Sequence, residues 1–133
     1  MRILVVEDDR DIAELVRYNL IADAHDVTIV YDGIPALCEL RKDRFDLLIL
    51  DLMLPALPGL EVCKAVRANP VLKDLPILIM TAHVDAAIRD TALSMGANDY
   101  LPKPFTPCDL RNRMRKLAPV STFISVASTA VSN

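Results

Sequence analysis

The sequence lacks the features that mark several large classes of protein. Its 133 residues hold 15 lysines and arginines against 18 aspartates and glutamates, which gives a net charge of -3. Because such a chain has no basic footprint, we expect no direct contact with nucleic acid by this domain. No apolar run is long enough to span a membrane, and the first residues lack the apolar core of a signal peptide. These absences favour a cytoplasmic protein without a membrane anchor.

Cysteine is also scarce, with three residues that are odd in number and far apart in the chain. This spacing is not that of a metal site, so we interpret them as reduced thiols. Hydrophobic residues make up 53% of the chain and charged residues 25%, a composition that supports a compact core. We expect one domain over residues 1–118. The remainder, 119–133, lacks helical periodicity and is expected to be a linker remnant or a disordered tail.

Five short apolar runs alternate with stretches in which apolar residues recur at helical spacing. Apolar runs of this kind are typical of strands that are buried on both faces of a parallel sheet. Strand–helix–strand units of this length connect parallel strands by right-handed crossovers. The sequence therefore predicts an α/β fold with a parallel five-stranded sheet. The expected strands are 2–6, 27–30, 47–50, 77–80 and 100–101, and helices are expected to follow from about residues 11, 35, 59, 85 and 106.

Polar side chains follow four of these five strands. Glu7 and Asp8 follow the first strand, Asp51 the third, Thr81 the fourth and Lys103 the fifth. Because the carboxyl ends of parallel strands open into the crevice where ligands bind, we expect these side chains to meet there. Any one of them alone has an ordinary interpretation as a turn or surface residue. Their occurrence together at strand ends of one sheet favours a functional site.

The chemistry of this set is that of phosphoryl transfer to a carboxylate. Three crowded carboxylates repel one another unless a cation is present, and oxygen ligands suit Mg²⁺. We expect Asp8 and Asp51 to be direct ligands and Glu7 to act through water. Asp51 is the predicted nucleophile, which would form an aspartyl phosphate. The Lys103 ammonium group, expected in a solvated crevice, and the Thr81 hydroxyl would stabilise charge on the phosphoryl group.

Four segments of the chain resemble the receiver domain of two-component response regulators, over roughly residues 1–118. This resemblance implies a flavodoxin-like fold with strand order 2-1-3-4-5 and Mg²⁺-dependent phosphorylation of Asp51. The expected phosphoryl donor is a phosphohistidine of a sensor histidine kinase or a phosphotransfer protein. The domain would then be a signalling switch that catalyses only its own phosphorylation and dephosphorylation. The matching segments are VVEDD at 5–9, LLILDLMLP at 47–55, TA at 81–82 and GANDYLPKPF at 96–105.

The resemblance also implies roles for individual residues. The backbone carbonyl of Met53 would bind Mg²⁺, and Thr81 and Tyr100 would form a switch in which the hydroxyl moves and the ring turns inward. The peptide bond between Lys103 and Pro104 is expected to be cis. The loop after Asp51, PALPGLE, departs from the usual pattern of the family, which we expect to affect its rigidity rather than its chemistry.

Charged residues near the fifth strand resemble those of the winged-helix transcription-factor subfamily, which suggests a role in transcription regulation. In that subfamily, receivers dimerise through the face made by the fourth helix, fifth strand and fifth helix. Arg89 would pair with Asp109, and Asp99 with Arg113, across a two-fold axis. Individual surface pairs are weak, and an ordinary solvated face is the alternative interpretation.

Two other functions use related residues. An Mg²⁺-dependent phosphatase or phosphotransferase of the haloacid dehalogenase type would also form an aspartyl phosphate. It would need a second Asp two residues after the nucleophile, where this chain has Met53. A pseudo-receiver that acts only as an interaction module would be expected to lose an acidic residue, the Thr or the Lys. The presence of Asp51, Thr81 and Lys103 argues against that alternative.

Overall fold

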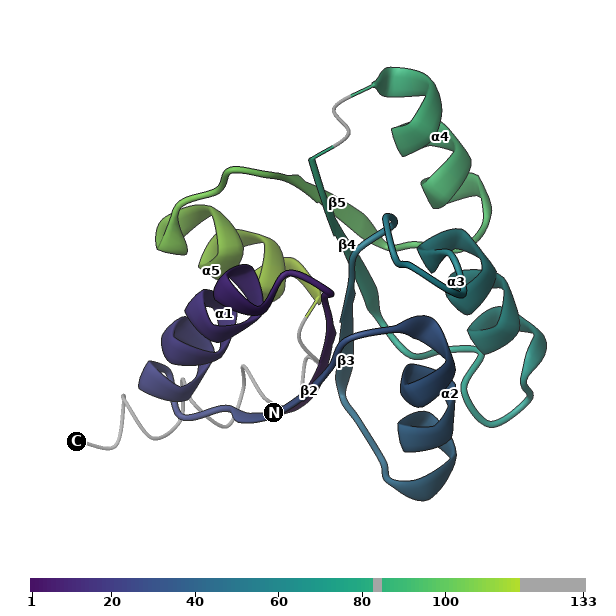
Figure 1. The fold of residues 1–133 in the computed structure, drawn as a ribbon, viewed down its shortest axis with the longest axis horizontal. Coiled ribbons are helices and arrows are strands. Elements are labelled where there is room, and N and C mark those ends of the chain that lie inside the picture. The colour runs from purple at the N-terminus through teal and green to yellow at the C-terminus, as the bar shows by residue number, and fades with distance from the viewer. Residues whose placement is uncertain (83–84, 118–133) are drawn as a thin grey trace.

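Five strands and five helices alternate along the described part of the chain in the computed structural model (Figure 1). The structure describes residues 1–82 and 85–117, so the expected tail at 119–133 lies outside the described residues. No helix in the described part of the chain is long and apolar enough to cross a membrane. The elements are β1 Arg2–Val6, α1 Arg10–Ala22, β2 Asp26–Val30, α2 Gly33–Lys42, β3 Leu47–Leu50, α3 Gly59–Ala68, β4 Ile77–Thr81, α4 Ala86–Ser94, β5 Asp99–Pro102 and α5 Pro107–Leu117.

All neighbouring strands are parallel, and their order is β2-β1-β3-β4-β5. This confirms the predicted α/β fold and the strand order of the flavodoxin-like class. The last residue of β1, Val6, lies opposite the last residue of β3, Leu50. The two strands therefore end level with each other, and the residues that follow them emerge side by side.

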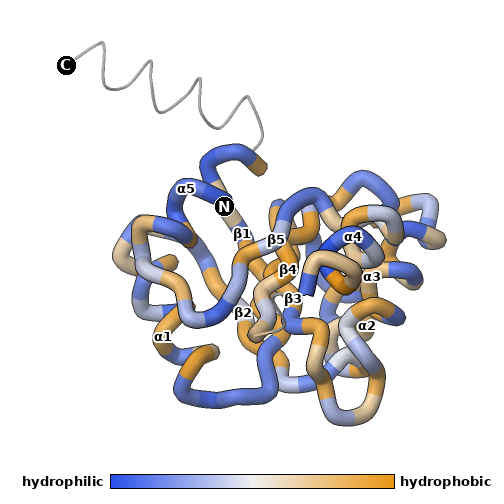
Figure 2. The backbone as a smooth tube through the Cα atoms, turned by 90° about the horizontal axis from the view of Figure 1, so that it is seen from above, coloured by the Kyte–Doolittle hydropathy of each residue, from blue (hydrophilic) through white to orange (hydrophobic). Residues whose placement is uncertain are grey.

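The sheet separates two hydrophobic layers because its buried strands alternate their side chains between faces. Leu48 and Leu50 of β3 belong to the cluster that includes residues of α2 and α3, whereas Leu47 and Ile49 pack with residues of α1 and α5. Figure 1 shows α1 and α5 on one side of the strands and α2, α3 and α4 on the other. Figure 2 shows hydrophobic segments gathered at the central strands and hydrophilic segments at the periphery.

The element boundaries agree with the local signals in the sequence. Thr106 and Asp109 form a reciprocal capping box at the start of α5: the Thr106 N–H donates to Asp109 Oδ2 at 3.1 Å, and the Asp109 N–H donates to Thr106 Oγ1 at 3.1 Å. Gly96 follows the end of α4 with a φ of 110°, the left-handed conformation that glycine adopts most easily. Strand β5 extends one residue beyond the predicted 100–101 at each end.

Candidate functional site

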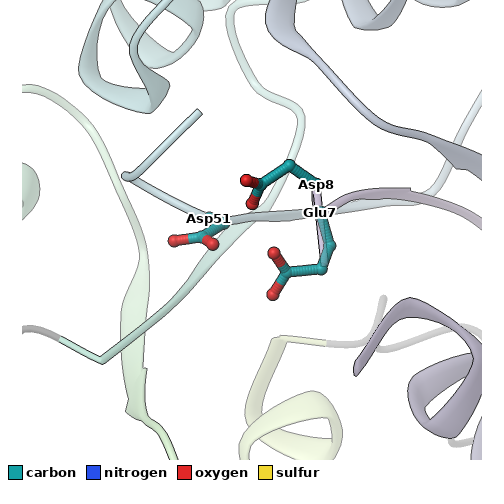
Figure 3. Close-up of side chains that lie close together, drawn as sticks. All are labelled: Glu7, Asp8 and Asp51. Atoms are coloured by element: carbon teal, nitrogen blue, oxygen red, sulfur yellow. The ribbon is translucent and has the colours of Figure 1, made fainter. Parts of the chain in front are cut away.

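Three carboxylates meet where β1 and β3 end. Glu7, Asp8 and Asp51 each offer one oxygen, and these oxygens lie within 4.8 Å of one another. The side chain of Asp8 is exposed, whereas Glu7 is 0% exposed and Asp51 3% exposed. Figure 3 shows the three carboxylate groups turned toward the same side of the strand ends. The structure thus brings together the carboxylates that the sequence analysis singled out.

Lys103 supplies a positive charge to this cluster. Strand β5 ends at Pro102, and the Lys103 N–H donates to the Thr81 carbonyl at 2.8 Å, which fixes the start of the following loop. Its ammonium group donates to Glu7 Oε1 and, at 3.0 Å, to Asp51 Oδ2. The Lys103 side chain is only 12% exposed, so the expectation of a solvated crevice is wrong. Two buried carboxylates hold the lysine inside, and its peptide bond to Pro104 is cis as expected.

Burial controls the protonation of this cluster. Burial and the neighbouring Asp51 together raise the pKa of Glu7 from 4.5 to about 8, against the opposing effect of Lys103. Burial also opposes the charged form of Lys103, but its bonds to Glu7 and Asp51 outweigh that effect and raise its pKa. The raised pKa keeps Lys103 protonated at neutral pH, and the raised pKa of Glu7 favours the protonated form of its carboxyl group.

The loop that follows Asp51 is hydrogen-bonded to the Asp51 carboxylate. The Met53 N–H donates to Asp51 Oδ1 at 3.0 Å, so backbone and lysine each hold one oxygen of Asp51. The loop ends at Gly59, whose N–H donates to the Leu52 carbonyl at 3.0 Å. A side chain at Gly59 would meet the backbone of Asp51 and Leu52, so this close approach requires glycine. The role of the Met53 carbonyl in metal binding stays a prediction.

Thr81 and Tyr100 lie on adjacent strands. Thr81 is 0% exposed at the end of β4, and Tyr100 lies two positions before the residue that faces Thr81 in β5. The Tyr100 ring is buried, and its hydroxyl group has no hydrogen-bond partner among the residues that the structure describes. Burial raises the pKa of this hydroxyl. The ring therefore already points inward, while its coupling to Thr81 stays a prediction.

The four residues of the expected dimer face have partners within the chain. Arg113 donates to Asp99 at 2.9 Å, Arg89 lies 3.5 Å from Asp90, and Asp109 caps α5. Arg89, Asp99 and Arg113 line one pocket of about 390 Å³ together with Asp90, Leu93, Tyr100 and Pro102. The structure thus places three of the four around one pocket. Any pairing of Asp99 with Arg113 across a two-fold axis would have to replace the pair inside the chain.

Sequence reasoning missed two side chains that tie loops to helices. Asp32 accepts hydrogen bonds from the loop that follows Asp51, although the dipeptide Asp32-Gly33 had only the signature of a turn. Arg67 of α3 donates to the Gly96 carbonyl at 2.9 Å and to the Leu75 carbonyl at 2.7 Å. The Asp32-Gly33 dipeptide indicates a turn but not the distant loop that Asp32 binds, and nothing in the local sequence distinguishes Arg67.

The site can hold a small, hard cation and support chemistry at Asp51. Its donor set consists of carboxylate oxygens from Glu7, Asp8 and Asp51, with one of them exposed to solvent. Oxygen ligands, few carboxylates and access to water are the features of Mg²⁺ sites, so the residues present fit this ion. A phosphoryl group at Asp51 would lie beside the Lys103 ammonium group, which already contacts Asp51.

Comparisons with known proteins agree with this geometry. Residues 3–115 match the family described as "Response regulator receiver domain". The chain is 47% identical over 117 residues to response regulator MprA of Mycobacterium avium and 46% identical over 117 residues to that of Mycobacterium tuberculosis. These alignments cover 88% of this chain and 50% of each relative, so the chain spans about half their length. The chemotaxis protein CheY4 of Vibrio cholerae has a similar structure, with a TM-score of 0.83 and 32% identity over 87% of this chain and 97% of that one.

Proposed function

Because this chain belongs to the response regulator receiver domain family of two-component systems, we propose that Asp51 is its phosphoacceptor. A single observation carries the proposal: at one sheet edge, Asp51 lies in contact with Lys103 and beside Glu7 and Asp8. The phosphoryl donor would be a phosphohistidine of a sensor histidine kinase or of a phosphotransfer protein. The domain acts as a phosphorylation-dependent switch rather than as an enzyme that turns over a separate substrate.

In the proposed reaction, an oxygen of the Asp51 carboxylate attacks phosphorus while the bond from phosphorus to the donor imidazole nitrogen breaks. The electron pair of that bond stays on the imidazole, which takes a proton from solvent. Lys103 and Thr81 stabilise the negative charge of the transferred group. Mg²⁺, held by Glu7, Asp8, Asp51 and the Met53 carbonyl, would supply further charge neutralisation when bound.

The groups around Asp51 orient its carboxylate and set the charge of the site. The Met53 N–H and the Lys103 ammonium group hold the two oxygens of Asp51, which fixes the direction of the carboxylate. The pKa of Glu7 is raised, so a divalent cation bound by Asp8 and Asp51 would favour loss of the Glu7 proton, and the Glu7 carboxylate would then act on the ion through water. In this proposal the carboxylates provide the negative charge that binds the metal, and the Lys103 ammonium group interacts with the phosphoryl group.

The proposed output runs from Thr81 and Tyr100 to the face formed by α4, β5 and α5. The hydroxyl of Thr81 would move to the phosphoryl group, and Tyr100, which lines the pocket beside Arg89 and Arg113, would respond. A ligand acts at a distance only if it favours one of two arrangements of such an element. We propose that the favoured arrangement forms a symmetric dimer in which Arg89, Asp99, Asp109 and Arg113 take part.

The chain fits the receiver part of a longer protein. It spans about half the length of the two response regulators named above. We propose that residues 1–118 form the receiver and that the charged residues around β5 place it in the winged-helix subfamily, with transcription regulation as its output. Three free cysteines support a cytoplasmic location.

The Asp51→Asn substitution tests the phosphoacceptor. It removes the nucleophile and one charge of the metal site, so it should abolish acid-labile phosphate incorporation from acetyl phosphate, measured by intact-mass spectrometry. The wild-type reaction should require Mg²⁺. Asp74→Asn makes the same chemical change at an exposed carboxylate and should leave incorporation unchanged. Stoichiometric incorporation by Asp51→Asn would show that another residue is phosphorylated.

A further inference from the structure

Asp32 connects two loops that are far apart in the sequence. It is the N-cap residue of α2, and its Oδ1 accepts hydrogen bonds from the N–H groups of Gly33 at 2.6 Å, Ala56 at 3.4 Å and Leu57 at 3.3 Å. The last two belong to the loop between Asp51 and α3. One carboxylate oxygen therefore joins the start of α2 to the loop that leaves the phosphorylation site.

In the segment 55–58 of that loop, every backbone N–H group donates to Asp32. Ala56 and Leu57 lie between Pro55 and Pro58, and proline has no N–H. All backbone donors of the four-residue segment 55–58 thus go to Asp32. In an isolated peptide the N–H groups of Ala56 and Leu57 would bond to water. Here both donate to the same oxygen of Asp32.

The helix that Asp32 caps leaves the carboxylate available for this second task. An N-cap side chain usually accepts from the second or third residue of its helix. The third residue of α2 is Pro35, which has no N–H to give. The Asp32 side chain bonds instead to the first residue, Gly33, and to the loop.

Gly33 shows independently that the loop lies tightly against this turn. A Cβ at Gly33 would come 2.8 Å from the Leu57 carbonyl oxygen and 2.7 Å from a methyl group of Val62. Real side chains do not tolerate such distances, so any other residue would displace the loop or α3. The absence of a side chain at position 33 and the carboxylate at position 32 together hold Leu57 in place.

We propose that Asp32 is a positioning residue for the phosphorylation site, because it fixes the loop whose first turn holds the Asp51 carboxylate. The loop is anchored at Met53 by Asp51, at Ala56 and Leu57 by Asp32, and at Gly59 by Leu52. Without the middle anchor, the segment 55–58 would have no hydrogen bond from its backbone N–H groups to Asp32, and the loop would be held only at its two ends. The inference rests on the proposed function in one respect, namely that the Asp51 edge is where Mg²⁺ and phosphate bind.

The pKa of Asp32 is consistent with this role. The backbone N–H groups of Gly33, Leu57 and Ala56 hold the pKa of the carboxyl group below its usual range, against the opposing effect of burial. Asp32 is therefore charged over the whole range in which the site operates, and its bonds to the loop are charge-assisted.

Three substitutions at this position separate anchoring from helix capping. Asp32→Ala removes both. Asp32→Ser keeps a good N-cap, but its hydroxyl group is one bond too short to span to the loop. Asp32→Asn keeps an oxygen acceptor at the same place and should rescue the function. Asp85→Ala is the matched control, since Asp85 caps α4 by accepting from Ala87 within that helix.

Two measurements should be made on each variant. Mg²⁺ affinity, from NMR or calorimetric titration, should fall about tenfold in Asp32→Ala and Asp32→Ser, the lower range for loss of a group that supports metal ligands. It should stay within about twofold of wild type in Asp32→Asn and Asp85→Ala. Amide hydrogen exchange should show lost protection at Ala56 and Leu57 in the first two variants. The Gly59 amide, which donates to Leu52, provides an internal reference.

The outcomes distinguish this inference from the proposed function. Asp32→Ala and Asp32→Ser that bind Mg²⁺ as tightly as Asp85→Ala would overturn the positioning role, even if the wild type takes up phosphate at Asp51. Unchanged protection of Ala56 and Leu57 in Asp32→Ser would overturn it as well. A wild-type chain that binds no Mg²⁺ and takes up no phosphate would overturn the proposed function and this inference together.

Discussion

Lys103 is the one cation in contact with Glu7 and Asp51 among the described residues, so its removal tests how the site is held together without metal. Lys103→Met keeps most of the side-chain length and removes the charge. Glu7 is 0% exposed and Asp51 3% exposed, so solvent compensates poorly for the loss of the ammonium group. We expect the variant to fold but to be considerably less stable than the wild type in metal-free buffer.

The magnitude follows from the number of buried charges that remain. Removing one partner of a buried ion pair typically costs roughly 3–5 kcal/mol, because the other charge is left buried and unpaired. Glu7 can relieve part of this cost by keeping a proton, since its pKa is already raised. The loss should therefore lie near the lower end, about 3 kcal/mol. For a chain of this size that corresponds to a fall in Tm of about 12 °C.

The assay is thermal or urea unfolding in the presence of a chelator and then with saturating Mg²⁺. Lys42→Met is the matched control, because Lys42 is 69% exposed and has a single surface partner, Glu39, at 3.3 Å. Its loss should stay below about 1 kcal/mol. Mg²⁺ should stabilise Lys103→Met more than the wild type, because the ion no longer competes with an ammonium group for Glu7 and Asp51.

Two results would refute this reasoning. If Lys103→Met is destabilised no more than Lys42→Met without metal, the carboxylates do not depend on Lys103 for charge balance. If Mg²⁺ stabilises the wild type and Lys103→Met equally, then the ion and the ammonium group do not share the same carboxylates. Either result would require a different arrangement of Lys103 from the one observed.

Two further predictions concern Glu7 and the face around β5. The pKa of Glu7 in the folded state, about 8, lies above its usual value of 4.5, so protonated Glu7 stabilises the fold fully below pH 4.5 and this stabilisation is lost as the pH rises to about 8. The Tm of the metal-free wild type should therefore fall relative to that of Glu7→Gln between these two pH values. Parallel Tm curves for the two proteins would contradict the raised pKa. Beryllofluoride with Mg²⁺ should shift the chain from monomer toward dimer in sedimentation, and Arg113→Glu should weaken that dimer; a dimer insensitive to Arg113→Glu would exclude the proposed pairing.

The fold was predictable because its strong local signals agree with one another. Leu47–Leu50 is a strand in the sequence pattern because four consecutive apolar residues can be buried only between two layers of helices. Once such strands are parallel, the residues that follow them must share one edge, which brought Glu7, Asp8 and Asp51 together from sequence alone. The positions of these carboxylates could be predicted from the order and direction of the strands, without knowledge of side-chain geometry.

Lys103 and Asp32 show where this kind of reasoning stops. The position of Lys103 at the carboxylate edge followed from the strand order, but its burial did not: it lies between two prolines, a setting typical of exposed loops, yet its side chain is 12% exposed and in contact with Glu7 and Asp51. Asp32 precedes a glycine as in many turns, and its bonds reach residues 24 and 25 positions away. The residues next to Asp32 in the sequence do not indicate hydrogen-bond partners so far along the chain. Both side chains are set by tertiary contacts that no periodicity encodes.

The pair Asp99 and Arg113 shows how the structure limits the predicted pairing across a dimer axis. Both line the pocket near Tyr100, and they bond to each other at 2.9 Å within one chain. An exchange of this pair for the same pair across a dimer axis replaces one ion pair by another, so it adds little affinity. Affinity must then come from surface that becomes buried between the two copies, with the charges selecting the register. The proposed switch would therefore act by changing the shape around the pocket, which Tyr100 lines, rather than by changing the number of ion pairs.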